Sequence, residues 1–428
     1  MTALTRLTAI AAAKQIESGA LTAVRLAQAY IESIRSRNPE IEAYLAWDEA
    51  KILQEARMAD ALPASSILRG LPYAVKDVIE TANYPTTYGS PIYRDHTGER
   101  DAGVIVRARE EGAVLLGKLA TGEFATQTPG RARNPLNPDH TPGGSSSGSG
   151  AAVGGEMALM AFGTQTTASI IRPAVYCGIV GYKPSFGLLP MTGVSQLSPT
   201  QDTVGMLTRT VEDAALFTGG LHGYRLSCES VTSPRIGVLE SSQWQYASPE
   251  TVAAIERLAK TLEKAGAIIS RWKLPAMFES LVDDQARLVA YDGRHSLAHE
   301  RVRHHELLSR RLQDRLASGL EMSLPEYLAV LQRVSAARSA MTSFFSDVDV
   351  MLYPATEAEA ERGLESSGSP RFGALWSLMH NPCVSFPTEN GPGGLPLGVQ
   401  VIGRYGDDFK VLSIARMASA LSSGQTSV

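Results

Sequence analysis

Residues 104–118 read VIVRAREEGAVLLGK, and the order of residue types in this stretch indicates the fold class. Its apolar residues recur at helical spacing up to Ala108, Gly112 stands where a helix C-terminal cap belongs, and the apolar run 113–116 follows. Residues 253–275, AAIERLAKTLEKAGAIISRWKLP, repeat this layout. A helix that ends at a glycine and leads into a buried strand is typical of α/β proteins. The sequence therefore predicts an α/β fold.

The rest of the chain extends this pattern on both sides. Residues 1–65 have helical spacing, as in LTAVRLAQAYIESIRSRNP, and we expect that helix to end at Pro39. Short apolar runs with Gly and Pro fill residues 66–225, and residues 226–345 are charged and helix-rich, as expected of a helical cover. VDVMLYPAT, NPCVSFP and LPLGVQVIG predict strands in residues 346–428. We expect one domain, whose sheet is completed by this last part.

Composition narrows the class of protein. The 428 residues are 44% hydrophobic and carry a formal net charge of -4, with Lys and Arg scattered, which disfavours binding to nucleic acid or to an anionic membrane. No apolar run reaches the length of a membrane span, and the amino terminus lacks a signal-peptide pattern. Cys177, Cys228 and Cys383 are far apart, which favours the cytoplasm. His295 and His299 lack the accompanying residues of a metal motif, so we expect no metal.

The most unusual segment is TPGGSSSGSGAAVGG, residues 141–155. A flexible linker is disfavoured, because a helix of small residues follows at once. GSSSG matches a nucleophile elbow centred on Ser146, and the later glycines resemble a dinucleotide loop, but both motifs need a preceding strand. The preceding residues 131–144 contain three prolines and no apolar run. What remains is a loop of hydroxyl and N–H groups that enters a helix, suited to an anionic transition state or a serine-based proton path.

Two other positions could complete such a path. Lys76 follows the strand-like run GLPYAV, and a buried lysine can be neutral near pH 7 and act as a base; a lysine that extends to solvent at a strand end is the alternative. Ser169 follows the strand-like ALMAFG in the segment 163–187, GTQTTASIIRPAVYCGIVGYKPSFG. The N–H groups of that segment could converge on one oxygen, as in an oxyanion hole.

Five ordered blocks resemble the amidase signature family over most of the chain. The blocks are GLPYAVKD at 70–77, GGSSSGSGAA at 143–152, the segment 163–187, DTVGMLTRTVEDAA at 202–215, and NPCVSFP with GGLPLGVQVIG at 381–403. The resemblance implies an amidase-signature fold, a mixed central β-sheet sandwiched between α-helices, with residues 66–225 as the signature core. It also implies a hydrolase that needs no metal and no cofactor.

The resemblance further implies a Ser, cis-Ser, Lys triad. Ser169 would attack the amide carbonyl, and Ser145, after a cis peptide bond, would connect Ser169 to Lys76. Backbone N–H groups of residues 166–169, which are Thr166, Thr167, Ala168 and Ser169, would form the oxyanion hole.

The chain departs from the family pattern at Thr167 and Ala168, where Gly-Gly is common. Either the loop keeps ordinary φ/ψ, giving a slower or narrower enzyme, or the site is impaired. GTQT and SIIRPA most resemble malonamidase-type enzymes, in which an arginine at the position of Arg172 would hold a substrate carboxylate. Ser146 and Trp376 are further candidates for substrate binding. A structural arginine and a core tryptophan are the alternatives.

These residues predict an amidohydrolase that cleaves a small-molecule amide, such as a malonamate-like one, through an acyl-enzyme. The alternatives are a carbamate or aryl-amide hydrolase of the same family, a binding protein with a disabled site, and a component of an amidotransferase assembly that resembles the tRNA-dependent A subunit. The shorter length favours the free-standing enzyme over the assembly. We expect a small-molecule amide as the partner, and a homodimer is possible.

Overall fold

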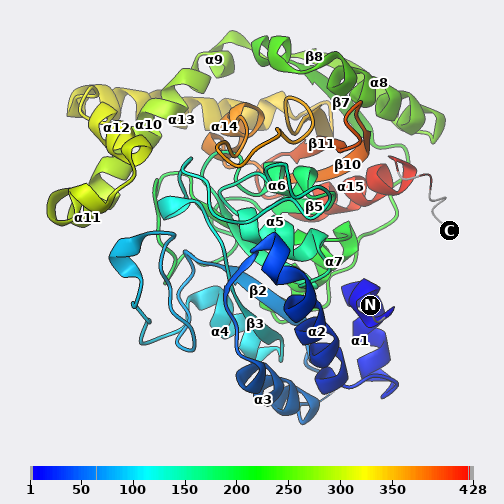
Figure 1. Ribbon diagram of the computed structural model, residues 1–428. Helices are drawn as coiled ribbons and strands as arrows, with labels where there is room; N and C mark the ends of the chain where they lie inside the picture. The colour runs from blue at the N-terminus through cyan, green and yellow to red at the C-terminus, as the bar shows by residue number, and fades with distance from the viewer. Residues whose placement is uncertain (1–2, 64, 423, 425–428) are drawn as a thin grey trace.

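The computed structural model describes residues 3–63, 65–422 and 424. Within them, eleven strands form one mixed sheet in the order β1-β3-β2-β4-β6-β5-β10-β11-β9-β7-β8 (Figure 1). The strands are β1 (Tyr44–Ala46), β2 (Pro72–Lys76), β3 (Val114–Leu119), β4 (Met160–Gln165), β5 (Val180–Lys183), β6 (Thr203–Thr208), β7 (Arg235–Glu240), β8 (Ile268–Lys273), β9 (Val350–Pro354), β10 (Cys383–Asn390) and β11 (Pro396–Gly403).

Helices from all parts of the chain accompany this sheet. The α-helices are α1 (Ala9–Glu17), α2 (Ala23–Ile41), α3 (Glu49–Asp60), α4 (Gly103–Glu110), α5 (Ser147–Gly154), α6 (Ile171–Tyr176), α7 (Val211–Leu221), α8 (Pro249–Lys264), α9 (Ala276–Glu279), α10 (Leu281–Ser296), α11 (Ala298–Arg303), α12 (Arg310–Ser318), α13 (Leu324–Phe344), α14 (Arg371–Leu378) and α15 (Asp408–Ser422). Short 3-10 helices are η1 (Ala3–Arg6), η2 (Pro91–Tyr93), η3 (Glu123–Ala125), η4 (Ser242–Tyr246) and η5 (His305–Leu307).

Strand β9 shows how the sheet is sandwiched between helices. Alternate residues of a strand point to opposite faces. Val350 and Leu352 join a hydrophobic cluster with α7, α8 and α15, whereas Met351 and Tyr353 join one with α10, α13 and α14. The predicted α/β fold with a mixed sheet between helices is therefore confirmed.

The helix-glycine-strand pattern that predicted this fold is present at both places. Helix α4 leads through Gly112 into β3, and α8 leads through Gly266 into β8; both glycines have positive φ, at 81° and 94°. The second strand differs from the prediction of a buried strand. It is the edge strand beside β7, and Ile268 is 57% exposed. Strand β8 is last in the strand order, so its side chains have strand neighbours on one side only, in β7, and all of them stay exposed or partly exposed.

The helix that was predicted to end at Pro39 extends beyond this residue, so the predicted end is wrong. Helix α2 contains Pro39 and continues to Ile41, and Glu42 at its C-terminal cap has φ 53°. A proline so near the end of a helix removes one backbone hydrogen bond and leaves the preceding turns intact. The helix therefore ends at the left-handed cap.

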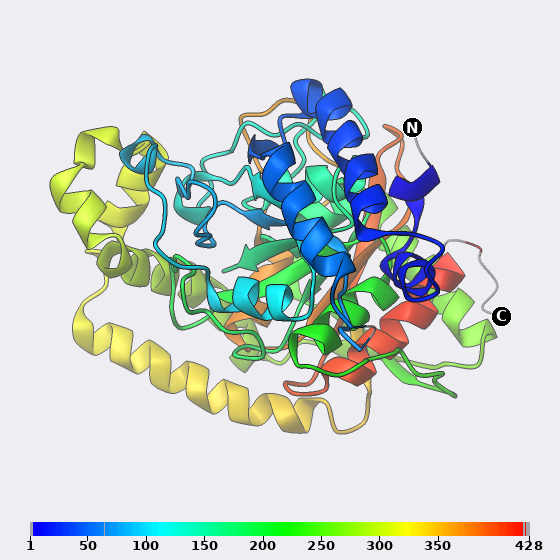
Figure 2. The same ribbon diagram turned by 90° about the horizontal axis from the view of Figure 1, so that it is seen from below.

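Residues 226–345, expected as a helical cover, include β7 and β8 of the sheet, and the continuous helical part of this segment is α9 to α13. These helices lie along one side of the molecule, and the long α13 runs along its outside (Figures 1 and 2). Helix α10 packs against α12, α13 and α14. The helices near the two ends of the chain, α1 and α15, both pack against α7. Among the described residues, none of the helices combines the length and hydropathy that a membrane span requires.

Candidate active site

Lys76 is the last residue of β2 and is fully buried. Its Nζ donates hydrogen bonds to Ser145 Oγ at 2.7 Å and to Thr164 Oγ1 at 2.8 Å. The alternative of a lysine that extends to solvent is therefore excluded. Strands β2 and β4 are parallel neighbours, and this pairing brings Thr164 of β4 beside the lysine.

The surroundings of Lys76 favour its neutral form. Burial lowers the pKa of Lys76 to about 7, since a charged ammonium loses its hydration; Asp202 opposes this shift and Arg172 adds to it. Burial also raises the pKa of Asp202 to about 6. The lowered pKa favours the neutral amine, which is the form that can accept a proton.

Ser145 follows a loop, and no strand directly precedes it. The structure has no strand between residues 120 and 159, which agrees with the exclusion of an elbow and of a dinucleotide loop. The peptide bond Gly144–Ser145 is cis, and Ser145 is 2% exposed. Ser146 is fully buried, and its hydroxyl bonds to the backbone of Thr164 in β4. The Ser146 hydroxyl is thus engaged with the protein itself.

Ser169 lies between β4 and α6 and is 8% exposed. Among the described residues, no hydrogen bond involves its hydroxyl, and none uses the N–H of Thr167, Ala168 or Ser169. By contrast, Gln165 Oε1 accepts the next two N–H groups, those of Ile170 at 2.9 Å and Ile171 at 3.1 Å. The segment therefore keeps three consecutive N–H donors available beside a serine hydroxyl.

Thr167 and Ala168 keep ordinary backbone conformations. Seven non-glycine residues of the described chain have positive φ, and neither Thr167 nor Ala168 is among them. The loop does not use the conformations that only glycine adopts readily. The sequence left two outcomes open for Thr167 and Ala168 in place of Gly-Gly. The structure agrees with the first, a loop with ordinary φ/ψ angles.

Arg172 lies on α6 and is 3% exposed. Its Nη2 donates to the carbonyl oxygen of Gly144, and it lies 3.5 Å from Ser367 Oγ. Its Nε and Nη1 are buried without a hydrogen-bond partner. Burial lowers the pKa of Arg172 to about 10. The side chain thus supports the loop before Ser145 and keeps unused donors.

Trp376 belongs to the hydrophobic core. It lies on α14, is 1% exposed and packs edge-on against Tyr353 with ring centroids 5.6 Å apart. It does not line the cavity beside Ser145. This burial favours a core role for Trp376 over substrate binding, because a side chain that binds substrate needs a face open to the ligand.

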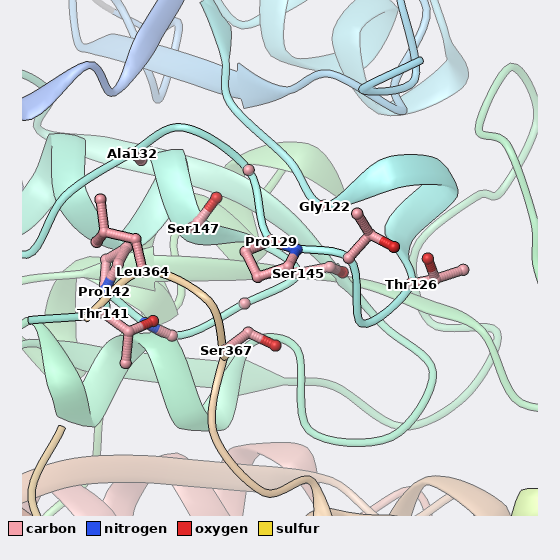
Figure 3. Close-up of a pocket in the computed structure, with 14 residues that line it drawn as sticks. Gly122, Thr126, Pro129, Ala132, Thr141, Pro142, Ser145, Ser147, Leu364 and Ser367 are labelled. Carbon is pink, nitrogen blue, oxygen red and sulfur yellow. The ribbon is translucent and has the colours of Figure 1, made fainter. Parts of the chain in front are cut away.

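A narrow cavity of about 10 Å³ opens beside Ser145. Figure 3 shows Ser145 between the loop that carries Gly122, Thr126 and Pro129 and the segment that carries Leu364 and Ser367. Small and hydroxyl-bearing residues form most of its wall. Segments far apart in the sequence therefore meet at this serine.

Four residues that contact the site were assigned no role from the sequence. Thr164 bonds Lys76, and Asp202 accepts the Thr166 hydroxyl. Gln285 Nε2 lies 3.2 Å from Thr167 Oγ1, and Ser377 Oγ donates to the Thr167 carbonyl at 3.0 Å. Asp202 opens one of the five blocks, but no local pattern marks Gln285 or Ser377.

Within the described residues, no group of three or more His, Cys, Asp or Glu residues is arranged to hold a metal ion. The three cysteines are free, and Cys177 and Cys383 are buried.

Residues 25–412 match the family model described as Amidase. The chain belongs to the amidase family. The predicted amidase signature family is thereby confirmed, and this amidase is an enzyme of amide hydrolysis, like relatives of known structure.

Several proteins resemble this amidase along nearly its whole length. It is 30% identical to the A subunit of glutamyl-tRNA(Gln) amidotransferase from Roseiflexus castenholzii, over 97% of this chain and 95% of the relative. It is 28% identical to the same subunit from Lachnospira eligens, over 96% and 97%. A crystal structure of an amidase superposes with a TM-score of 0.87 at 28% identity, over 97% and 99%.

These relatives correct the narrower expectation. They are A subunits of an amidotransferase, and they do not single out the malonamidase type. The likeness runs along nearly the whole of both relatives, over 97% of the Lachnospira subunit and 95% of the Roseiflexus subunit.

Proposed function

We propose that the chain hydrolyses a small amide, with Ser169 as nucleophile, Ser145 as proton relay and Lys76 as base. The observation that carries the proposal is the 2.7 Å hydrogen-bonding distance between Lys76 Nζ and Ser145 Oγ, at a fully buried lysine whose pKa is lowered to about 7. When Lys76 is neutral, its lone pair can accept this hydrogen bond from the Ser145 hydroxyl. A buried neutral amine next to a serine hydroxyl is suited to removing a proton.

The reaction has two halves. As Ser169 Oγ forms a bond to the amide carbon, its proton passes to Ser145, and the Ser145 proton passes to Lys76. The carbon–nitrogen bond then breaks, and the relay returns a proton to the leaving amine. Water attacks the resulting ester by the same route and frees Ser169. The relay requires Ser169 and Ser145 to approach when substrate binds, as catalytic hydrogen bonds often tighten only in the complex.

The negative oxygen of the intermediate would lie against the N–H groups of Thr167, Ala168 and Ser169, with Thr166 at the start of the loop. Their lack of partners among the described residues supports this role. Each donor aimed at a developing oxyanion contributes about 10²- to 10³-fold in rate.

The proposal is tested with a fluorophosphonate probe and an amide panel. We expect covalent labelling at Ser169, located by mass spectrometry, and expect Ser169→Ala and Lys76→Ala to lower kcat by roughly 10³-fold or more. The control is Ser242→Ala, which changes an exposed serine on η4 and should leave the rate unchanged. Wild-type rates in Ser169→Ala or Lys76→Ala would refute the triad.

For the setting of this reaction, we propose that the chain works within an amidotransferase-like assembly. The A-subunit relatives, similar over at least 96% of this chain, support it. The purified chain alone should then release little ammonia from glutamine. Addition of the remaining subunits of a glutamyl-tRNA(Gln) amidotransferase should raise the rate. Equal rates with and without partners would contradict this setting.

A free-standing hydrolase of a carboxylate-bearing amide is the second candidate. Arg172 favours it, since two of its buried guanidinium nitrogens lack partners and a carboxylate accepts from such a fork. A panel that pairs malonamate with neutral amides, carbamates and aryl amides should show an anionic preference that Arg172→Met removes. If Arg172→Met affects anionic and neutral substrates equally, the carboxylate role is wrong.

A further inference from the structure

Thr167 is held on two sides by helices that belong to the second half of the chain. Its hydroxyl oxygen lies 3.2 Å from Nε2 of Gln285 on α10. Its carbonyl oxygen accepts a 3.0 Å hydrogen bond from Ser377 on α14. Ser377 in turn accepts from Gln165 at 3.1 Å. The residue is therefore fixed both through its side chain and through its backbone.

Gln285 is itself firmly placed. It is 3% exposed, and the same Nε2 donates to Gln201 Oε1 at 2.9 Å. An amide NH₂ group has two hydrogens, so it can serve Gln201 and Thr167 together. The buried amide thus connects the cover helix α10 to the loop that precedes Ser169.

Helix α14 also approaches this loop closely. A Cβ at Gly373 would lie 2.8 Å from Ala168 Cβ and would overlap the Thr167 carbonyl oxygen. Only the missing side chain at 373 leaves room for the side chain at 168. The loop is therefore enclosed by α10 and α14 and has little space to shift.

We propose that Gln285 is a positioning residue that acts through the Thr167 hydroxyl to hold the N–H groups of Thr167, Ala168 and Ser169 toward the oxyanion. A glycine at 167 would offer no hydroxyl to anchor. A glycine would leave the backbone at position 167 freer to move, whereas the threonine hydroxyl ties the loop to Gln285 of α10. This inference rests on the proposed function, because it assigns these N–H groups to the oxyanion.

A double-mutant cycle tests the inference. The variants are Thr167→Val and Gln285→Met, which remove the hydrogen bond with little change of volume, and the double variant. The readouts are the rate of fluorophosphonate labelling at Ser169, which forms an anionic phosphorus centre, and kcat and KM for any amide that is hydrolysed. We expect each single variant to lower labelling and kcat by about 3- to 10-fold with little change in KM. Gln285→Met also removes the hydrogen bonds to Gln201 and to the Thr166 carbonyl. The double variant should therefore be no slower than Gln285→Met alone, since that change already breaks the bond that Thr167→Val breaks.

Two controls separate positioning from loss of folding. Thr167→Ser keeps the hydroxyl and should retain nearly wild-type rates. Gln313→Met makes the same substitution on α12, where the amide bonds only the carbonyls of His305 and Leu308, and should leave the rates unchanged. Thermal melting of each variant identifies unfolding; should Gln285→Met unfold, the contrast of Thr167→Val with Thr167→Ser decides.

The outcomes distinguish this inference from the proposed function. Wild-type labelling rates in Thr167→Val, or effects of the two single variants that multiply in the double variant, overturn the positioning role alone. Failure of the wild-type chain to label at Ser169 overturns the proposed function and the inference with it.

Discussion

Lys76 is a lysine without exposure to solvent. A lysine side chain is usually solvated, but here it is fully buried, and its Nζ makes short contacts with Ser145 and Thr164. Asp202 and Arg172 act on its pKa in opposite directions. The protonation of this one amine should therefore control the rate.

We predict that kcat/KM rises with pH and levels off above about pH 7. Lys76 must be neutral to accept a proton, and its pKa is lowered to about 7, so the rate should fall about tenfold per pH unit below that value. A stopped or continuous assay between pH 5 and 9 on one substrate checks this. A flat profile would contradict the role of Lys76.

Two neighbouring charges provide the control for that profile. Asp202 raises the pKa of Lys76, so Asp202→Asn should move the rising limb to lower pH. Arg172 lowers the pKa, so Arg172→Met should move the limb to higher pH. Shifts in the same direction for both variants would indicate that another group titrates.

Helix α14 sets the space around the nucleophile loop at the scale of elements. It presents Gly373 to Ala168, Ser377 to the Thr167 carbonyl, and Trp376 to the core. One short helix thus packs against the sheet with one face and bounds the site with another. The fit between this helix and the loop should be sensitive to a single methyl group.

We predict that Gly373→Ala lowers both activity and stability. The new Cβ would lie 2.8 Å from Ala168 Cβ, so the loop or the helix must move. Overpacking of this kind costs about 1–3 kcal/mol, measured as the free energy of unfolding in urea, and kcat should fall with it. Gly103→Ala at the start of α4, whose nearest neighbours would be side-chain carbons at 3.3 Å, is the control. Equal behaviour of the two variants would contradict the close approach.

The whole molecule buries several ionisable groups in its interior. Burial lowers the pKa of Lys76 to about 7 and that of Lys118 to about 8, although Asp77 lies 3.4 Å from Lys118. Lys183 is fully buried, and its pKa is lowered as well. In the unfolded chain these lysines regain ordinary pKa values near 10.4.

We predict that the folded chain is more stable at pH 8.5 than at pH 7. In this window the unfolded chain binds protons at Lys76 and Lys118 that the folded chain releases, so stability rises with pH, by up to about 1.4 kcal/mol per pH unit for each neutral lysine. Melting temperatures at constant ionic strength measure this. Lys76→Met should show a smaller rise, and a melting temperature that falls from pH 7 to 8.5 would contradict the prediction.

Much of the fold and part of the site could be predicted from local patterns. The positions of Gly112 and Gly266 marked helix-to-strand connections because a left-handed cap favours glycine. The prolines before residue 145 excluded a strand there, which the structure bears out. Local patterns failed for β8, since whether a strand lies at an edge depends on its partners and not on its own residues.

Short-range periodicity and turn chemistry were enough to predict the α/β class. The resemblance of five ordered blocks to the amidase signature family predicted the family and pointed to Lys76, Ser145 and Ser169. The groups that surround these residues became known only from the folded chain. Gln285 and Thr167 are 118 residues apart, and Ser377 and Thr167 are 210 residues apart. Such contacts arise from the packing of helices across the sheet, which sums many weak interactions over the whole chain, so no local stretch of sequence specifies them.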